Sequence, residues 1–227
     1  MEEYQIEKWV WTEKDFEKMG WHDATVYGMR LNTNLEIDLD YIFQWNQPEV
    51  EGFHFTFWVA PCTLVFESPK ELSFELTQSF DDSWLEIEDI EMNIQDDENQ
   101  WTIITHQGEI SFNADSFKQI VRKQPSLQLG QVVPYDERGG FSFDLTPGDT
   151  LNTEVRPEIV QRRKKQFEDY DLAKRRYELT QELEHVSQQR ESGQVETNDY
   201  LNNMKKLKER IDLLTFQLRG SSYNQGK

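Results

Sequence analysis

Leu35-Glu36-Ile37-Asp38-Leu39-Asp40-Tyr41 decides the fold class of this chain. Apolar side chains at positions 35, 37, 39 and 41 alternate with carboxylates at positions 36, 38 and 40. Because successive side chains of a strand point to opposite faces, this period of two predicts a β-strand with one apolar face in the core. The other face carries three carboxylates, and its ordinary interpretation is a sheet surface in contact with water.

Similar alternation recurs along the first 145 residues. It predicts strands at residues 24–31, 35–45, 53–59, 62–67, 72–76, 85–90, 101–106, 109–113 and 141–145, with short helices at 12–20 and 116–123. Short strands at close spacing, without βαβ repeats, are typical of an antiparallel sheet or sandwich. We therefore expect an acidic β-rich domain over residues 1–145 and a linker at 146–156.

A different pattern begins at Pro157. No Gly or Pro interrupts residues 158–192, which suits a helix with Pro157 at its first position. Ser192-Gly193 ends this helix, and a second one is expected at 197–218. The two predict an antiparallel helical hairpin at 157–219, before a disordered tail at 220–227. The whole chain is therefore expected to be α+β.

The apolar residues of the second helix recur at intervals of four and three, as in a coiled-coil seam. They are Tyr200, Met204, Leu207, Ile211, Leu214 and Leu218. A helix pair this thin often needs a further surface to cover its apolar side. An antiparallel hairpin hides this stripe against the first helix, and we expect the pair to use these six residues further to dock on the β domain or to form a homo-oligomer.

The charge is strongly acidic and uneven. The net charge is −19, and residues 1–156 carry 31 Asp+Glu against 10 Lys+Arg, a balance of −21. Residues 157–219 carry 13 Lys+Arg against 12 Asp+Glu. A domain so acidic repels nucleic acid and anionic membrane, so neither is an expected partner. It attracts a basic protein, although solubility alone is an equally good explanation of the charge.

The single cysteine, Cys62, excludes an internal disulfide, and its apolar surroundings in sequence predict a buried thiol. The first residues lack the basic and apolar regions of a signal peptide. No apolar stretch approaches the ~20 residues of a membrane span. The sequence therefore predicts a cytoplasmic protein.

The sequence gives little support to an enzyme, because it lacks the common catalytic motifs. No HExxH, CxxC, GxGxxG, P-loop or GxSxG pattern is present. The best metal or catalytic candidate is His22 with Asp23, because imidazole and carboxylate can hold a divalent ion. The sheet could bring further ligands to them: His54, His106, and Asp38 or Asp40. The favoured interpretation is that His22 orders a turn and Asp23 accepts backbone N–H bonds, so no cofactor, metal or catalytic residue is predicted.

The partner-binding surface is expected on the carboxylate face of the sheet and on nearby aromatic residues. The predicted residues are Glu36, Asp38, Asp40, Glu86, Glu88, Trp9 and Trp11. Core packing is the safer interpretation of the two tryptophans, but Trp is also enriched among interface anchors.

Two stretches resemble known bacterial families. Leu183, Val186, Ser192-Gly193-Gln194-Val195, Asp199-Tyr200 and Leu207 resemble the SHOCT motif, a short C-terminal helical hairpin, although the first helix here is longer. That resemblance implies an oligomerisation or interaction element.

The other stretch, Phe16-Glu17-Lys18-Met19-Gly20-Trp21-His22-Asp23-Ala24, is similar to a Trp-His-Asp opening of β-rich families. The similarity extends over Phe57-Trp58-Val59-Ala60-Pro61-Cys62. Some of these families are predicted immunity proteins of toxin systems, which implies a non-catalytic protein that binds and blocks a toxin.

The leading hypothesis is therefore a non-catalytic acidic protein that binds or inhibits a basic partner, with an immunity factor as its specific form. The alternatives are a self-associating structural or adaptor protein, a metal-dependent enzyme centred on His22 and Asp23, and a DNA mimic.

Overall fold

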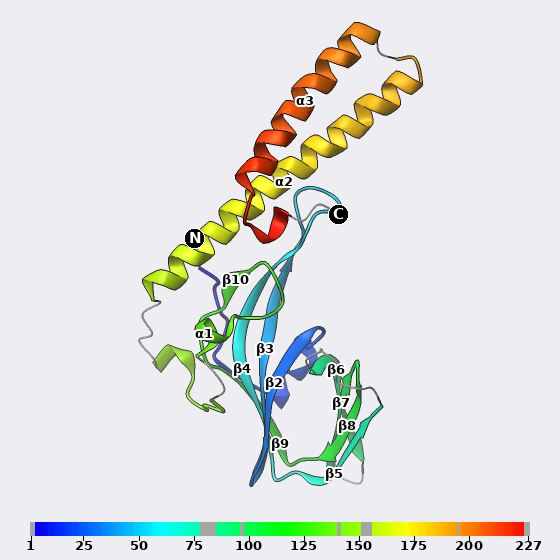
Figure 1. The fold of residues 1–227 in the computed structure, drawn as a ribbon. Coiled ribbons are helices and arrows are strands. Elements are labelled where there is room, and N and C mark those ends of the chain that lie inside the picture. The colour runs from blue at the N-terminus through cyan, green and yellow to red at the C-terminus, as the bar shows by residue number, and fades with distance from the viewer. Residues whose placement is uncertain are drawn as a thin grey trace. The chain divides into compact units, whose positions relative to one another are not determined.

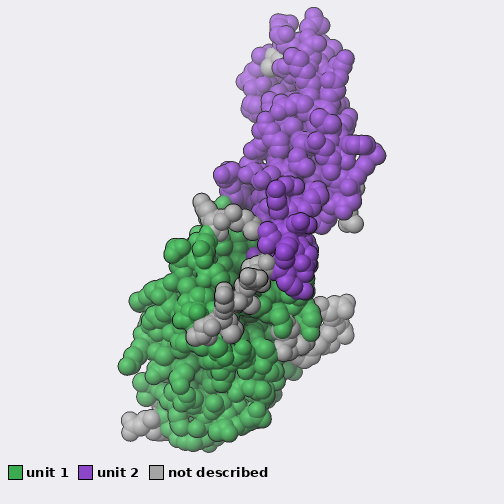
Figure 2. All heavy atoms as spheres, turned by 90° about the vertical axis from the view of Figure 1, so that its left-hand side faces the viewer, with its two compact units in different colours: residues 1–47, 55–153 green, residues 48–54, 154–227 purple. Residues whose placement is uncertain are grey.

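The structure is a computed structural model that describes residues 3–77, 85–95, 98–139, 142–150, 156–194 and 196–224. It divides into two compact units, which Figure 2 colours separately. Unit 1 comprises residues 1–47 and 55–153, and unit 2 comprises residues 48–54 and 154–227. The α+β fold class is confirmed, since an antiparallel sheet precedes two long helices.

Unit 1 is built on a ten-stranded antiparallel sheet within the described residues (Figure 1). Its strands are β1 (Val10–Thr12), β2 (Ala24–Leu31), β3 (Asn34–Asn46), β4 (Thr56–Glu67), β5 (Lys70–Leu76), β6 (Leu85–Gln95), β7 (Glu98–Thr105), β8 (Gly108–Asn113), β9 (Ser116–Val121) and β10 (Ser126–Gln128). Their order across the sheet is β1-β9-β4-β3-β2-β6-β7-β8-β5, and β10 pairs with β4. A short 3-10 helix, η1 (Glu13–Lys18), follows β1.

The sheet curls so that apolar side chains from β3 and β4 meet those of β7 and β8 in one core. Its centre is aromatic: Phe66, Trp101 and Phe117 contact one another with ring centroids 5.1–5.3 Å apart. The predicted apolar face of β3 belongs to this core, because Leu35, Leu39 and the residues between them on the same face are buried. Burial of such aromatic area supplies much of the drive to fold.

Four predicted elements differ from the structure. The helix expected at 116–123 is strand β9, whose Phe117 and Val121 face the core and which pairs with β4 along its length. The strands expected at 53–59 and 62–67 are one strand, β4, which continues through Pro61. Residues 142–145 of the strand expected at 141–145 have no regular structure, and residue 141 lies outside the described residues.

Unit 2 is the predicted helical hairpin, formed by α2 (Pro157–Glu191) and α3 (Thr197–Gln217). Residues 48–54, between β3 and β4, belong to this unit rather than to the sheet. Phe53, expected in a strand, is buried, with ring centroids 5.1 Å from Tyr170 and 5.5 Å from Tyr177. The Tyr170 hydroxyl donates to the backbone carbonyl of His54 at 2.7 Å, so the loop is fixed to α2.

The predicted disordered tail is ordered in part. A 3-10 helix, η3 (Ser222–Asn224), lies within it, and the Arg176 guanidinium donates to the Tyr223 carbonyl at 2.7 Å. Among the helices of the described chain, none combines the length and the apolar composition needed to cross a membrane.

Candidate functional site

The predicted carboxylate face of β3 is not exposed to water. Residues 131–139 and 142–147, here called the strap, cover this face of β2, β3 and β4. Val133 of the strap packs with Ile42, Phe57 and Val59 in a second apolar cluster. The expected solvated sheet face is therefore wrong, and Glu36, Asp38 and Asp40 are 6%, 0% and 0% exposed.

Asp40 forms a buried ion pair with Arg138, which lies in α1 (Tyr135–Arg138) of the strap. Arg138 Nη2 lies 2.5 Å from Asp40 Oδ2, and its Nε lies 3.3 Å from Oδ1. The Val133 amide also donates to Oδ2 at 2.9 Å. The guanidinium stacks 3.6 Å above the Tyr27 ring. Burial raises the pKa of the Asp40 carboxyl, and the hydrogen bond from Arg138 opposes that rise.

Asp38 is satisfied in a similar way. The Thr63 hydroxyl donates to its Oδ1 at 2.6 Å, and the Phe143 amide donates to Oδ2 at 2.9 Å. Arg122 Nη1 lies 3.5 Å from the same oxygen. Glu36 accepts a hydrogen bond from Arg30 Nε at 3.0 Å. A buried charge is tolerated when it is paired and hydrogen-bonded. Asp38 and Asp40 therefore hold the strap on the sheet, whereas Glu36 pairs with Arg30 of the neighbouring strand β2.

Exposed carboxylates lie instead on the outer face of β5, β6 and β8. Glu75, Asp89, Glu91 and Glu109 are exposed there and are here called the acidic outer face. Glu75 lies directly opposite Glu109, and Asp89 shares their row across Ile104. Within the described residues, no Lys or Arg forms an ion pair with any of the four. Like charges directly opposite on a sheet repel each other.

The part of this face on β6 was missed because the strand is irregular. The register shifts between Ile87 and Asp89, which adds a residue and turns the acids that follow to the outside. Of the predicted partner-binding residues on β6, Glu88 is exposed and Glu86 is half-buried. The signal that could have located the face is the density of acids at 86–91, but their alternation breaks at the bulge.

Trp9 and Trp11, also predicted to bind a partner, are half-buried and pack against the core. Trp11 Nε1 donates to the Lys8 carbonyl at 2.9 Å. A Cβ atom at Gly148 would lie 2.4 Å from Trp9, so only glycine allows this approach. Their packing favours the core interpretation that the sequence already preferred.

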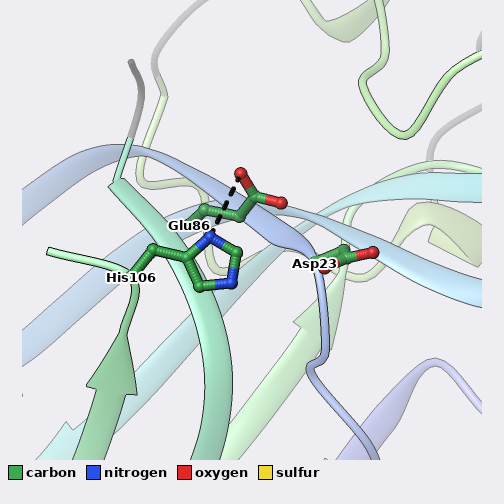
Figure 3. A group of neighbouring side chains, drawn as sticks. All are labelled: Asp23, Glu86 and His106. Atoms are coloured by element: carbon green, nitrogen blue, oxygen red, sulfur yellow. Dashed lines mark ion pairs between the residues drawn. The ribbon is translucent and has the colours of Figure 1, made fainter.

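A mixed group of imidazole and carboxylate side chains forms beside the start of β6 (Figure 3). Asp23, Glu86 and His106 each offer one ligand atom, and these atoms all lie within 4.8 Å of one another. Glu86 and His106 point toward each other, with 3.9 Å between Oε2 and Nδ1. His22 Nδ1 lies 2.9 Å from Asp23 Oδ1. The structure therefore joins Asp23 to one of the histidines expected near it, His106.

The other ligands considered for that group lie elsewhere. Asp38 and Asp40 are buried under the strap, and His54 belongs to unit 2. Sequence reasoning missed Glu86 as a neighbour of Asp23, because only the pairing of β2 with β6 brings the two together.

The predicted oligomerisation residues of α3 are used within the hairpin. Leu207 and Leu218 are 5% and 0% exposed, and Met204 Sδ accepts a hydrogen bond from the Ser187 hydroxyl of α2 at 3.9 Å. The other three residues of the seam are half-buried: Tyr200, Ile211 and Leu214. Self-association through them stays a prediction.

The chain matches no family model, no curated protein and no solved structure. Its resemblance to the SHOCT motif and to families with a Trp-His-Asp opening therefore stays a prediction.

Proposed function

We propose that this chain is a non-catalytic binding protein that recognises a basic protein partner through its acidic outer face. The observation that carries the proposal is the direct opposition of Glu75 and Glu109, with Asp89 in the same row. Carboxylates in such an arrangement repel one another and lower the stability of the sheet. A cationic partner relieves this repulsion when it binds, so the face gains more from a basic ligand than scattered surface acids do.

The charge of the chain supports the same function. If each of the 10 Lys and Arg residues of 1–156 formed an ion pair with one carboxylate, 21 of the 31 carboxylates in that range would still have no cationic partner. The resemblance of residues 16–24 to the Trp-His-Asp opening favours one specific form, an immunity factor that blocks a basic toxin. Self-association through α3 is compatible with this function, because it uses a different part of the chain.

The test compares two triple variants with equal net charge. One neutralises the acidic outer face with Glu75→Gln, Asp89→Asn and Glu109→Gln. The other changes three exposed glutamates of α2 to Gln: Glu182, Glu184 and Glu191. Each tagged protein is used for affinity capture from nuclease-treated lysate of the source cells at low and high salt, with the wild type alongside.

We expect the wild type and the α2 variant to recover one basic protein near 1:1, with less recovered at high salt. The variant of the acidic outer face should recover little of it. Equal recovery by both variants, or a recovered protein that is not basic, contradicts the proposal.

Stability offers an independent readout of the same face. Glu109→Gln removes the repulsion with Glu75, so we expect it to raise the free energy of unfolding by about 0.2–0.5 kcal/mol at low salt. Glu182→Gln should leave it unchanged. A loss of stability in Glu109→Gln would show that the face is not under electrostatic strain.

A further inference from the structure

The group at the start of β6 combines three donors that come from separate parts of unit 1. Asp23 lies in the turn before β2, Glu86 lies on β6, and His106 lies in the turn between β7 and β8. Backbone hydrogen bonds fix the three segments to each other. The Asp23 amide donates to the Ile87 carbonyl at 2.9 Å, and the His106 amide donates to the Glu86 carbonyl at 3.1 Å. The three candidate metal ligands are therefore held in place by backbone hydrogen bonds of the sheet.

The distances fit a shared ion better than a direct contact. The 3.9 Å between His106 Nδ1 and Glu86 Oε2 is too long for a hydrogen bond. Ligands at about 2.0–2.2 Å from one zinc ion lie about 3–4 Å from each other. The separations here, all within 4.8 Å, need only a small side-chain adjustment to reach that geometry.

The charges of the group and the hydrogen bonds to its ligand residues also favour a bound cation. Neither Asp23 nor Glu86 forms an ion pair with Lys or Arg within the described residues. Both oxygens of Asp23 are oriented by neighbours: the Gln131 side-chain amide donates to Oδ2 at 2.7 Å, and His22 Nδ1 lies 2.9 Å from Oδ1. Metal-binding side chains are typically oriented by such hydrogen-bond partners, which do not contact the metal themselves. The side chain of Asp23 is 14% exposed and that of His106 is 46% exposed, so the group opens to solvent.

We propose that Asp23, Glu86 and His106 bind a divalent first-row transition metal ion of the zinc type. One imidazole and two carboxylates suit such an ion, and three protein ligands leave a coordination position for water or a partner group. Calcium prefers six to eight oxygen ligands, which these three residues do not provide. This site shares no residue with the acidic outer face and does not rest on the proposed function.

The experiment uses the full chain, freed of metal with a chelator and then dialysed. Zinc is titrated calorimetrically, and cobalt is added separately because its visible absorption reports the ligand set. The ligand variants are His106→Ala and Glu86→Gln. His185→Ala is the matched control, because His185 is an exposed histidine on α2. Circular dichroism confirms that each variant is folded.

We expect the wild type and His185→Ala to bind one zinc per chain and to give the cobalt absorption. His106→Ala and Glu86→Gln should bind zinc at least about 10-fold more weakly and should lose the absorption. Gln131→Ala, which removes the hydrogen bond to Asp23 Oδ2, should weaken binding by about 10- to 100-fold. Zinc should also raise the Tm of the wild type but not that of His106→Ala.

Three results would overturn the assignment. One is wild-type zinc binding no tighter than about 1 mM. Another is binding by a folded His106→Ala variant equal to that of the wild type. The third is displacement of zinc by an equal concentration of calcium, which would indicate a site made of oxygen ligands alone.

Discussion

Removing Arg138 should expose the cost of burying a carboxylate under the strap. Asp40 is 0% exposed in the wild type, and in Arg138→Ala it keeps the Val133 amide but loses both guanidinium hydrogen bonds. Breaking a buried pair by removing one partner costs about 3–5 kcal/mol. Since small domains are stable by about 5–15 kcal/mol in total, this one change removes a large share of the stability of unit 1.

The assay is chemical unfolding of the purified variants, followed by tryptophan fluorescence. Lys70→Ala is the matched control, because Lys70 and Glu98 form an ion pair that is about half exposed, with 3.3 Å between nitrogen and oxygen. Its loss should cost no more than about 1 kcal/mol. The double variant Asp40→Asn with Arg138→Met should recover most of the loss, because uncharged side chains at both positions leave no unpaired buried charge.

The pH dependence gives a second readout. Burial raises the pKa of Asp40, and Arg138→Ala removes the interactions with Arg138 that oppose this rise, leaving only the Val133 amide and the charge of Arg122 against it. A folded state with the higher pKa binds a proton that the unfolded chain, with an Asp pKa near 3.9, releases. The deficit of Arg138→Ala should therefore be smallest near pH 4 and grow as the pH rises. A loss no larger than that of Lys70→Ala, and constant with pH, would refute the view that a buried ion pair closes the strap.

Three further outcomes follow from burial. Cys62 is 0% exposed and burial raises the pKa of its thiol, so a disulfide reagent at pH 8 should label it only after denaturant is added. Phe53→Ala should cost about 3 kcal/mol and make residues 48–54 sensitive to proteases, whereas Phe55→Ala, at a position that is 39% exposed, should do neither. Leu207→Ala should lower the stability of the helices by about 2–4 kcal/mol in circular dichroism, whereas Leu213→Ala, at a position 58% exposed, should change it by less than about 0.5 kcal/mol.

Local pattern was enough to predict most of the strands and the hairpin, but not β1, β9 or β10. The alternation at 35–41 identified β3 and its core face, and the spacing of apolar residues in α3 identified the face that meets α2. These predictions succeeded because side-chain period is a property of a single element. The helix predicted at 116–123 failed because pairing with β4 and β1 decides that segment, and no local signal reports such pairing.

The nature of the acidic face of β3 could not be predicted in the same way. Alternating acids ordinarily face water, but Arg122 and Arg138 pair with Asp38 and Asp40 from positions 84 and 98 residues further along the chain. The group around Asp23 is similar, since Glu86 and His106 reach it only through strand pairing. Sequence reasoning found Asp23 and considered His106, but it had no means of adding Glu86.

Burial of the ion pairs changes the ratio of acidic to basic groups on the surface without changing the net charge. Each pair removes one cation and one anion from contact with solvent. Because unit 1 has few cations, the loss of Arg122 and Arg138 to the interior matters more than the loss of two of its many acids. The remaining surface charges of unit 1 are therefore more one-sided in proportion, while their net charge, which sets the long-range attraction of a basic partner, stays the same.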